Sequence, residues 1–307
     1  MCPSPLGPVG VAAGVAPRMV DYRVVHVSVR DLVPDFVQFE HEAQRQTAIE
    51  LRQLWRTLYR ERHREVFDCY FRIGGEPPDL DSAVARLVGS GELFTERARR
   101  TSELIRSHAP RVLELLDAGA TELPYVIMVG VFRSDGWMAD LVDTPTAFFA
   151  VEQYKDPPWD EVTVVHETAH LVHAALQPEP WPDEQLGLRL MLEGLAINAT
   201  HELLPDLPEW AHWNFPPAEL DAWLRACADA RPRVGAQLRQ LMTATDPDER
   251  DRYFSPDWLR DARDVPPKVG YYVGAQVVER LRQQQSIAEL ARLGPREALD
   301  LAAETLA

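Results

Sequence analysis

The sequence predicts a mostly helical α+β protein, with a small β-sheet directly before one apolar helix and a helical region in the N-terminal part. Apolar residues recur at helical spacing through much of the chain before residue 120. Two runs rich in β-branched and aromatic residues, 125–132 and 146–152, are typical of strands. The run that follows, 161–176, is apolar and has the length of a helix. Together these observations indicate the α+β class.

Local patterns predict the N-terminal elements. Alternating apolar residues at 22–29 predict a short strand. A long helix is expected over 35–69, because its apolar residues form a stripe and a Gly- and Pro-rich segment follows it. A second helical region is expected over 80–116, with a break near 89–91. Pro110 could open the last helix of this region at its first turn.

The elements of the C-terminal half alternate with clear breaks. A turn signal at 134–136 lies between the two predicted strands, and the Pro-rich segment 177–182 must be a loop. Asp183 could cap the next helix, expected over 184–204. Later helices are expected at 218–230, 234–244, 271–285 and 295–306.

The chain divides into a Pro- and Gly-rich tail at 1–20, a mainly helical region at 21–120 and a second region at 121–307. The last two could equally form one integrated domain. The tail has no basic segment ahead of its apolar residues, so we expect a flexible tail and not a signal peptide. No run approaches 18 apolar residues, so no membrane span is expected.

Charge and cysteine content limit the possible partners. The formal net charge of −16 argues against nucleic acid and against an anionic membrane surface, since both are bound through clustered Lys and Arg. Cys2, Cys69 and Cys227 are few and widely spaced, and no two of them form a C-x-x-C pair. This cysteine usage fits a reducing compartment, so a cytoplasmic enzyme is expected.

The most informative motif is H-E-x-x-H at 166–170, inside the apolar helical run. Residues four apart on a helix lie on the same face, so the imidazoles of His166 and His170 can converge on one metal ion. Glu167 would then stand near the open position of the metal, where it can take a proton from bound water. Polar groups on so apolar a helix are costly to bury unless they are coordinated or hydrogen-bonded.

A catalytic zinc needs a third protein ligand, and Glu193 is the best candidate. It stands on its own predicted helix, far enough along for the chain to fold back, and a lone buried carboxylate must find a partner. The neighbouring Gly194 and Ala196 are small, which would let this helix approach the metal helix closely. His173 lies too far along the helix from His166 to share one ion with both motif histidines, and His201 is a weaker competitor for the third position.

A hydrogen-bond donor for a developing oxyanion is a further need of hydrolysis. Tyr271 and Tyr272 lie between Gly270 and Gly274 at the start of a predicted helix, from which a phenol could reach a cleft. Both tyrosines could equally be packing residues of an amphipathic helix.

The H-E-T-A-H motif at 166–170, the E-G-L-A motif at 193–196 and the G-Y-Y-V-G motif at 270–274 together resemble a bacterial family of predicted zinc-dependent proteases, a domain of unknown function related to a heat-shock-associated protein. That family belongs to the gluzincins. The resemblance implies a zincin-like catalytic lobe in region 121–307, with a small β-sheet before the metal-binding helix. It covers about residues 40–300 in order and length, but it is sharp only at the three motifs and the strand pair.

The family's functional residues carry over to matching positions. Glu167 matches the general base. Tyr271 matches the motif tyrosine, and because Tyr272 is a second aromatic there, the choice between them stays open. The residues that match the zinc ligands are His166, His170 and Glu193.

The expected function is a Zn²⁺-dependent hydrolase, a metallopeptidase that cleaves peptide or other amide bonds with a metal-activated water. An edge strand beside the cleft could pair with an extended peptide substrate, although both strands could simply be core. One alternative is a pathway-specific metalloenzyme acting on a small-molecule amide, ester or carbon–carbon bond. Another is a non-catalytic, metal-stabilised regulatory or binding protein. A His₂Glu site could also take Mn²⁺, Co²⁺ or Fe²⁺.

Overall fold

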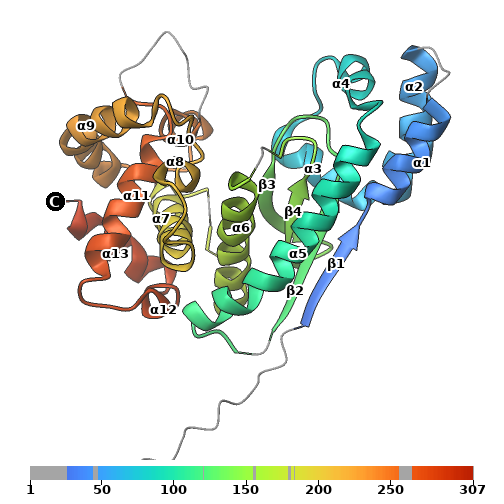
Figure 1. The fold of residues 1–307 in the computed structure, drawn as a ribbon. Helices are drawn as coiled ribbons and strands as arrows, with labels where there is room; N and C mark the ends of the chain where they lie inside the picture. Colours follow the sequence, from blue (N-terminus) through green and yellow to red (C-terminus); the bar gives the residue numbers. More distant parts are fainter. Residues whose placement is uncertain are drawn as a thin grey trace, which may run out of the picture.

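A computed structural model describes most of the chain (Figure 1). The described residues are 26–43, 48–119, 121–154, 157–178, 181–182, 184–255 and 265–306. Helices dominate, and the described residues contain one four-stranded sheet, so the α+β class and the helical N-terminal region are confirmed. The predicted tail at 1–20 lies outside the described residues.

The sheet has the strand order β1-β2-β4-β3. Its strands are β1 (His26–Asp31), β2 (Glu122–Met128), β3 (Gly136–Leu141) and β4 (Thr144–Ala150). β1, β2 and β4 run parallel, whereas β3 is antiparallel to β4 and forms an edge. The predicted pair of strands omitted β3, because only Trp137 of this strand is buried and no strict alternation marks it. Since β1 pairs with β2, the sheet draws on both predicted regions, and their boundary near 120 stays a prediction.

The N-terminal helices are more divided than predicted. They are α1 (Val33–Ala43), α2 (Ala48–Trp55), a π turn (Arg56–Arg60), a 3₁₀ turn (Glu61–His63), α3 (Arg64–Gly74), α4 (Leu80–Leu87) and α5 (Gly91–Leu115). The single helix expected over 35–69 was therefore wrong. The irregular turns let Trp55, Tyr59 and Phe67 all face the core. The ring centroid of Phe67 lies 5.3 Å from that of Trp55 and 5.2 Å from that of Tyr59.

The break expected near 89–91 is confirmed between α4 and α5, and Gly89 there has a φ of 94°. Pro110 lies inside α5 and does not open a helix, so that prediction was wrong. A proline costs one intrahelical hydrogen bond, and here the surrounding buried residues keep the helix continuous.

After the sheet, every regular element of the described residues is a helix. These helices are α6 (Trp159–Leu176), α7 (Leu186–Leu203), α8 (Glu209–His212), α9 (Leu220–Gln240), α10 (Pro247–Phe254), α11 (Val269–Leu281), α12 (Ile287–Leu290) and α13 (Pro295–Thr305). The two helices expected at 218–230 and 234–244 are one helix, α9, which continues through Pro232. The proposed cap Asp183 lies outside the described residues, and α7 begins after Gln185.

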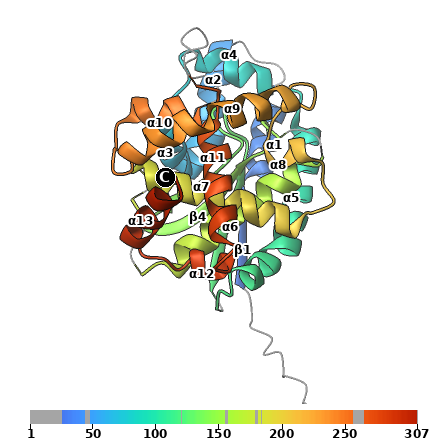
Figure 2. The same cartoon turned by 90° about the vertical axis from the view of Figure 1, so that its left-hand side faces the viewer.

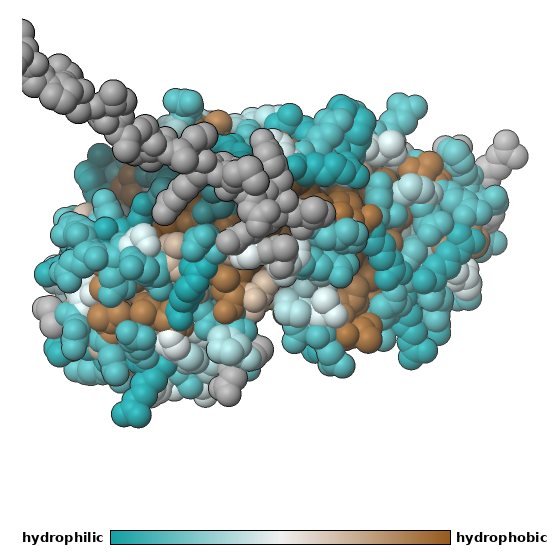
Figure 3. All heavy atoms as spheres, turned by 90° about the horizontal axis from the view of Figure 1, so that it is seen from below, coloured by the Kyte–Doolittle hydropathy of each residue, from teal (hydrophilic) through white to brown (hydrophobic). Residues whose placement is uncertain are grey.

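The layers follow one another across the molecule (Figure 1). α5 contacts β1 and β2, and α6 contacts β3 and β4. α7 packs against α6, and α11 packs against α7 on the side away from the sheet. One apolar cluster of buried residues extends from Leu32 to Ala302. Seen from below, the surface is mainly hydrophilic (Figure 3). Among the described helices, none has the length and apolar character needed to cross a bilayer.

A buried carboxylate holds the loop between β2 and β3. Glu152 accepts hydrogen bonds from the backbone N–H of Gly130 (2.7 Å) and of Phe132 (3.0 Å). The Tyr70 hydroxyl accepts another from Val131 (3.1 Å). A Cβ at Gly130 would lie 2.6 Å from the Tyr70 hydroxyl and 2.7 Å from Glu152 Oε1, so the backbone approaches both groups closely. This loop leads into β3, which borders the site described below.

Stability should depend on pH through Glu152. Burial raises the pKa of Glu152 from 4.5 to about 7, although its backbone donors oppose the shift. The folded state therefore favours the neutral acid, so this stabilisation is full below pH 4.5 and is lost as the pH rises through 7. Between those values the unfolding free energy should fall by up to about 3 kcal/mol relative to that of Glu152→Gln. Urea titrations at each pH measure it. The exposed Glu304→Gln should follow the wild type, whereas parallel profiles for wild type and Glu152→Gln would contradict the prediction.

The hairpin between β3 and β4 contains a strained turn. Val142 and Asp143 have φ values of 51° and 62°, and Val142 is 77% exposed. Two-residue turns of this kind prefer Asn-Gly, because a β-branched residue is poorly tolerated at positive φ. Val142→Asn combined with Asp143→Gly should raise the unfolding free energy by about 1–2 kcal/mol, measured by chemical denaturation. Val142→Thr keeps the β-branch and serves as the control. An equal gain in that variant would mean that the removal of an exposed apolar side chain, and not the relief of backbone strain, is responsible.

Candidate metal centre

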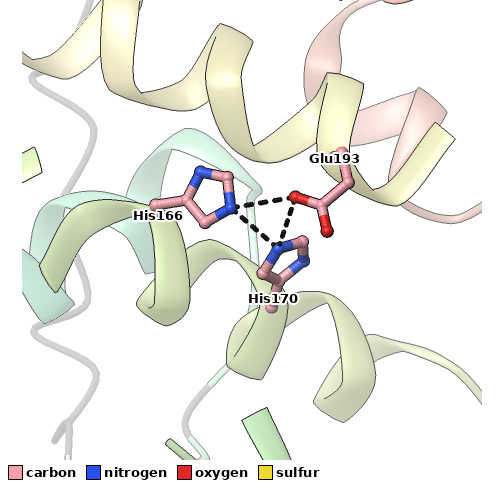
Figure 4. A group of neighbouring side chains, drawn as sticks. All are labelled: His166, His170 and Glu193. Atoms are coloured by element: carbon pink, nitrogen blue, oxygen red, sulfur yellow. Dashed lines mark hydrogen bonds and ion pairs between the residues drawn. The ribbon is translucent and has the colours of Figure 1, made fainter. Parts of the chain in front are cut away.

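The H-E-x-x-H motif lies in the middle of α6, where the surrounding apolar residues pack against β3, β4 and α7. His166 and His170 are one turn apart, and their ring centroids are 4.7 Å apart. Both imidazoles point toward α7 (Figure 4). Their side chains retain 17% and 13% exposure, so both histidines are largely buried but still reach solvent.

Glu193 meets these two histidines from α7 (Figure 4). Its Oε2 lies 3.0 Å from His166 Nε2 and 3.4 Å from His170 Nε2. The two Nε2 atoms are 3.1 Å apart. The structure thus brings the three predicted metal ligands together, and they form a group whose donor atoms all lie within 4.8 Å of one another.

The geometry and chemistry of this cluster fit a metal ion. Two ligand atoms, each about 2.0–2.1 Å from one tetrahedral zinc, lie about 3.3–3.4 Å apart. The observed separations of 3.0, 3.1 and 3.4 Å are close to that value. Two imidazole nitrogens and one carboxylate oxygen are also a donor set typical of catalytic zinc. Among the described residues, this is the one group of at least three His, Cys, Asp or Glu side chains that meets the distance requirement for a metal site.

Arg189 holds the other oxygen of the Glu193 carboxylate. It stands one turn before Glu193 on α7, and its Nη2 lies 2.9 Å from Glu193 Oε1. Burial alone would raise the pKa of Glu193, but the charges of Arg189 and His170 and hydrogen bonds to both histidines hold it well below its usual range. The carboxylate is therefore ionised, with Oε1 held by the guanidinium and Oε2 directed at the histidines.

Glu167 is buried beside the cluster and under the edge strand. A Cβ at Gly136, the first residue of β3, would lie 2.8 Å from Thr163 Cγ2 and 3.1 Å from Glu167 Cγ. Glycine therefore lets β3 start close to α6 without a shift of the Thr163 side chain. Burial raises the pKa of Glu167, the nearby His166 and His170 lower it, and the net shift is upward. A carboxyl shifted upward is better suited to accept and return a proton near neutral pH.

The two candidate tyrosines have different surroundings. Tyr271 is hydrogen-bonded to Arg189, and burial, followed by the negative charge of Glu193, raises its pKa. Tyr272 points into an aromatic group, with its ring centroid 6.0 Å from that of Trp213 and 6.3 Å from that of Trp223. The structure thus brings Tyr271 to the cluster and leaves Tyr272 away from it. A catalytic role for Tyr271 stays a prediction.

Gly194 lets α7 approach a neighbouring helix closely, but that helix is α11 and not the expected metal helix, α6. A Cβ at Gly194 would lie 2.3 Å from Gly274 O, and one at Gly274 would lie 2.3 Å from Leu190 O. The glycines therefore pack α7 against α11, and the expectation that Gly194 meets the metal helix was wrong. Ala196 does lie on the side of α6, where it shares a small apolar pocket with Ala169 and His170. The G-Y-Y-V-G motif supplies Gly274 to this contact.

The remaining candidate histidines lie outside the cluster. His173 is buried, and its ring packs at 4.6 Å against Trp181. Burial lowers the pKa of His173 to about 3, so it stays neutral. His201 stacks on His212 with ring centroids 4.1 Å apart, and its Nε2 donates to Glu209 Oε1 at 3.4 Å. Neither histidine joins the three ligand atoms.

Three residues near the site were not singled out in the sequence: Arg189, Gly136 and Lys268. Arg189 had a signal, because it stands four residues before a buried carboxylate on the same predicted helix. Gly136 is a turn residue in the sequence, and its contact with Glu167 depends on packing. Lys268 has a φ of 57°, and its Nζ lies 5.0 Å from the centre of the Tyr271 ring. Its charge opposes protonation of His166.

No family model, curated protein or solved structure matches this chain. The resemblance to predicted zinc-dependent proteases therefore rests on the three sequence motifs alone.

Proposed function

We propose that this protein is a metal-dependent hydrolase, with Zn²⁺ as the expected ion, and that it cleaves peptide bonds. The observation that carries the proposal is the convergence of His166, His170 and Glu193 next to the buried carboxyl of Glu167. The order of a small sheet, a metal-binding helix and a second helix with a glutamate ligand also supports a zincin-like lobe of the gluzincin type. Three protein ligands leave an open position, as catalytic zinc requires.

The residues divide the chemistry between them. Zinc bound by the three ligands would lower the pKa of a coordinated water toward neutrality and polarise the substrate carbonyl. Glu167 accepts a proton from the water and delivers it to the leaving amine. Tyr271 has one phenolic proton, and because Arg189 can only donate, the Tyr271 oxygen accepts from it. The phenolic proton is thus not used in that bond and can be donated to the developing oxyanion.

The edge strand supports a peptide substrate. Among the described residues, β3 has one strand neighbour, β4, so its other side presents main-chain donors and acceptors. Gly136 places the start of this edge against α6 next to Glu167. An extended peptide could pair with β3 and pass the catalytic carboxyl, which is the geometry of strand addition.

A substrate screen tests the proposal. The zinc-loaded protein is incubated with a quenched peptide library and with small-molecule amides and esters, and with each after treatment with a chelator. Peptide cleavage that is lost on chelation and restored by zinc is the expected result. Cleavage of small molecules alone would favour a pathway-specific enzyme. Stoichiometric zinc with no cleavage of any substrate would favour a metal-stabilised binding protein.

Arg189 should act as a positioning residue for the Glu193 ligand. Arg189→Met removes the bond to Glu193 Oε1 while retaining an unbranched side chain. Groups that orient a metal ligand typically contribute 10–100-fold to affinity, so zinc affinity should fall by about that factor. Competition with a zinc-binding dye measures it. Arg189→Lys should recover part of the loss, and Arg296→Gln on α13 is the charge control. Unchanged affinity in Arg189→Met would show that Glu193 needs no such support.

A further inference from the structure

A hollow outside the metal cluster is lined by residues of α9, α11 and the end of α13. Figure 2 shows these three helices. The hollow has a volume of about 610 Å³. In that view α11 runs down the middle, with α9 above it and α13 beside it. We call it the arginine groove, and the lining residues used below are Arg231, Gly235, Arg239, Val273, Val277 and Arg280. None of them belongs to the metal cluster.

The charge of the arginine groove contrasts with that of the chain. The protein carries a net charge of −16, yet the described residues of the lining include three arginines and neither Asp nor Glu. Many other arginines pair with carboxylates, as Arg100 does with Asp160 and Arg30 with Glu65. Arg231, Arg239 and Arg280 form no such ion pair with any residue in the part of the chain that the structure describes. Three guanidinium groups that pair with no carboxylate of the described residues favour binding of a negatively charged ligand.

Regular helical spacing forms the walls. Arg231, Gly235 and Arg239 are four residues apart along α9, so they lie on one face of that helix. On α11, Val273 and Val277 are also four apart, and both are buried. The groove thus has an apolar floor from α11 and a cationic rim, which suits a ligand with one charged end and an apolar body.

Gly235 is an independent indication of a binding site, because this residue leaves the arginine groove unfilled. A glycine inside a helix costs about 1 kcal/mol relative to alanine. Gly194 and Gly274 are explained by the contact between α7 and α11, where a Cβ would clash. At Gly235, the one described residue that a Cβ would meet within 4 Å is Leu306, at an ordinary distance of 3.6 Å. Packing therefore does not require glycine there, whereas a side chain would fill the groove between Arg231 and Arg239.

We propose that the arginine groove binds a small soluble organic anion that carries a carboxylate or phosphate group on an apolar body. Guanidinium groups bind both anions in a bidentate manner, and Val273 and Val277 contact the apolar part. The volume of about 610 Å³ lies within the range of small-molecule sites, roughly 300–1,000 Å³. The site is separate from the metal cluster, so it stands whether or not the protein is a hydrolase.

Calorimetry on the full chain tests this with four probes: octanoate, octyl phosphate, octanol and inorganic phosphate. One molecule of octanoate or octyl phosphate should bind per chain, at least about 10-fold more tightly than octanol or phosphate, since those lack the head or the body. Whichever of the two binds more tightly identifies the head group. Lack of binding by both, or equal binding of inorganic phosphate, would overturn the proposal.

Variants locate the binding. Arg231→Gln/Arg239→Gln/Arg280→Gln should weaken it at least 10-fold, while a triple variant of exposed arginines elsewhere, R106Q/R225Q/R296Q, should not. Gly235→Leu retains all three charges and fills the groove, so it should weaken binding to a similar extent. Equal losses in the two triple variants, or wild-type binding in the groove triple variant, would reject the site. The protein is also mixed with anionic lipid vesicles. If it binds the vesicles more tightly than it binds soluble octyl phosphate, the proposal of a soluble ligand is rejected.

Discussion

Glu167→Gln should keep its zinc and lose peptide cleavage by about 10²–10⁴-fold, the usual contribution of a general base. The amide has nearly the shape of the carboxyl but cannot accept the proton of a water molecule. Glu167 is not one of the three converging ligands, so the zinc content should not change. Elemental analysis of the loaded protein and single-substrate kinetics at saturating zinc measure the two quantities separately.

The control for this variant is Glu304→Gln, an equal change of charge at an exposed position on α13. It should retain both zinc and activity. Full activity of Glu167→Gln would reject Glu167 as the base, and another buried carboxyl would have to be sought. Loss of zinc together with activity would mean that Glu167 supports the ligands and is not the proton acceptor.

Glu193→Gln should lower zinc affinity by at least about 100-fold, more than the loss of a group that only orients a ligand. The variant keeps the side-chain volume inside α7 but removes the negative charge that faces His166 and His170. It also leaves Arg189 without the carboxylate that it now pairs with at 2.9 Å. Activity should fall in parallel and recover in part at high zinc concentration, since two histidine ligands remain.

Glu202→Gln is the matched control, because it stands on the same helix and also pairs with an arginine, Arg282. Its zinc affinity should equal that of the wild type. Titration with a zinc chelator of known affinity gives the dissociation constants of both variants. Undiminished zinc affinity in Glu193→Gln would remove Glu193 from the ligand set and with it the gluzincin type of site.

Helix α6 and its motif could be predicted from the sequence because they depend on local periodicity. The observed bounds, Trp159–Leu176, differ from the predicted 161–176 only at the start. Helix breaks at prolines were less predictable. α5 and α9 continue through Pro110 and Pro232, since buried neighbours on both sides outweigh one lost hydrogen bond.

Strand β3 and the surroundings of Tyr271 could not be predicted in the same way. β3 is half-exposed and pairs only with β4 among the described strands, so its sequence has little apolar alternation. Tyr271 and Tyr272 are adjacent, and their surroundings differ only because α11 turns one toward Arg189 and the other toward Trp213 and Trp223. The rotation of a helix about its axis is set by its packing partners and is not encoded in the motif.

The sequence by itself determined that His166 and His170 share one face and that Glu167 stands beside them, because a helix repeats every 3.6 residues wherever it lies. Only the tertiary structure decided that Glu193 meets both histidines, since that contact joins residues 27 positions apart. Tertiary packing also decided that Gly194 contacts α11 and that Gly136 lets the edge strand β3 lie next to Glu167. Such contacts depend on the distance between two elements. That distance is determined by the side chains and backbones of both elements together.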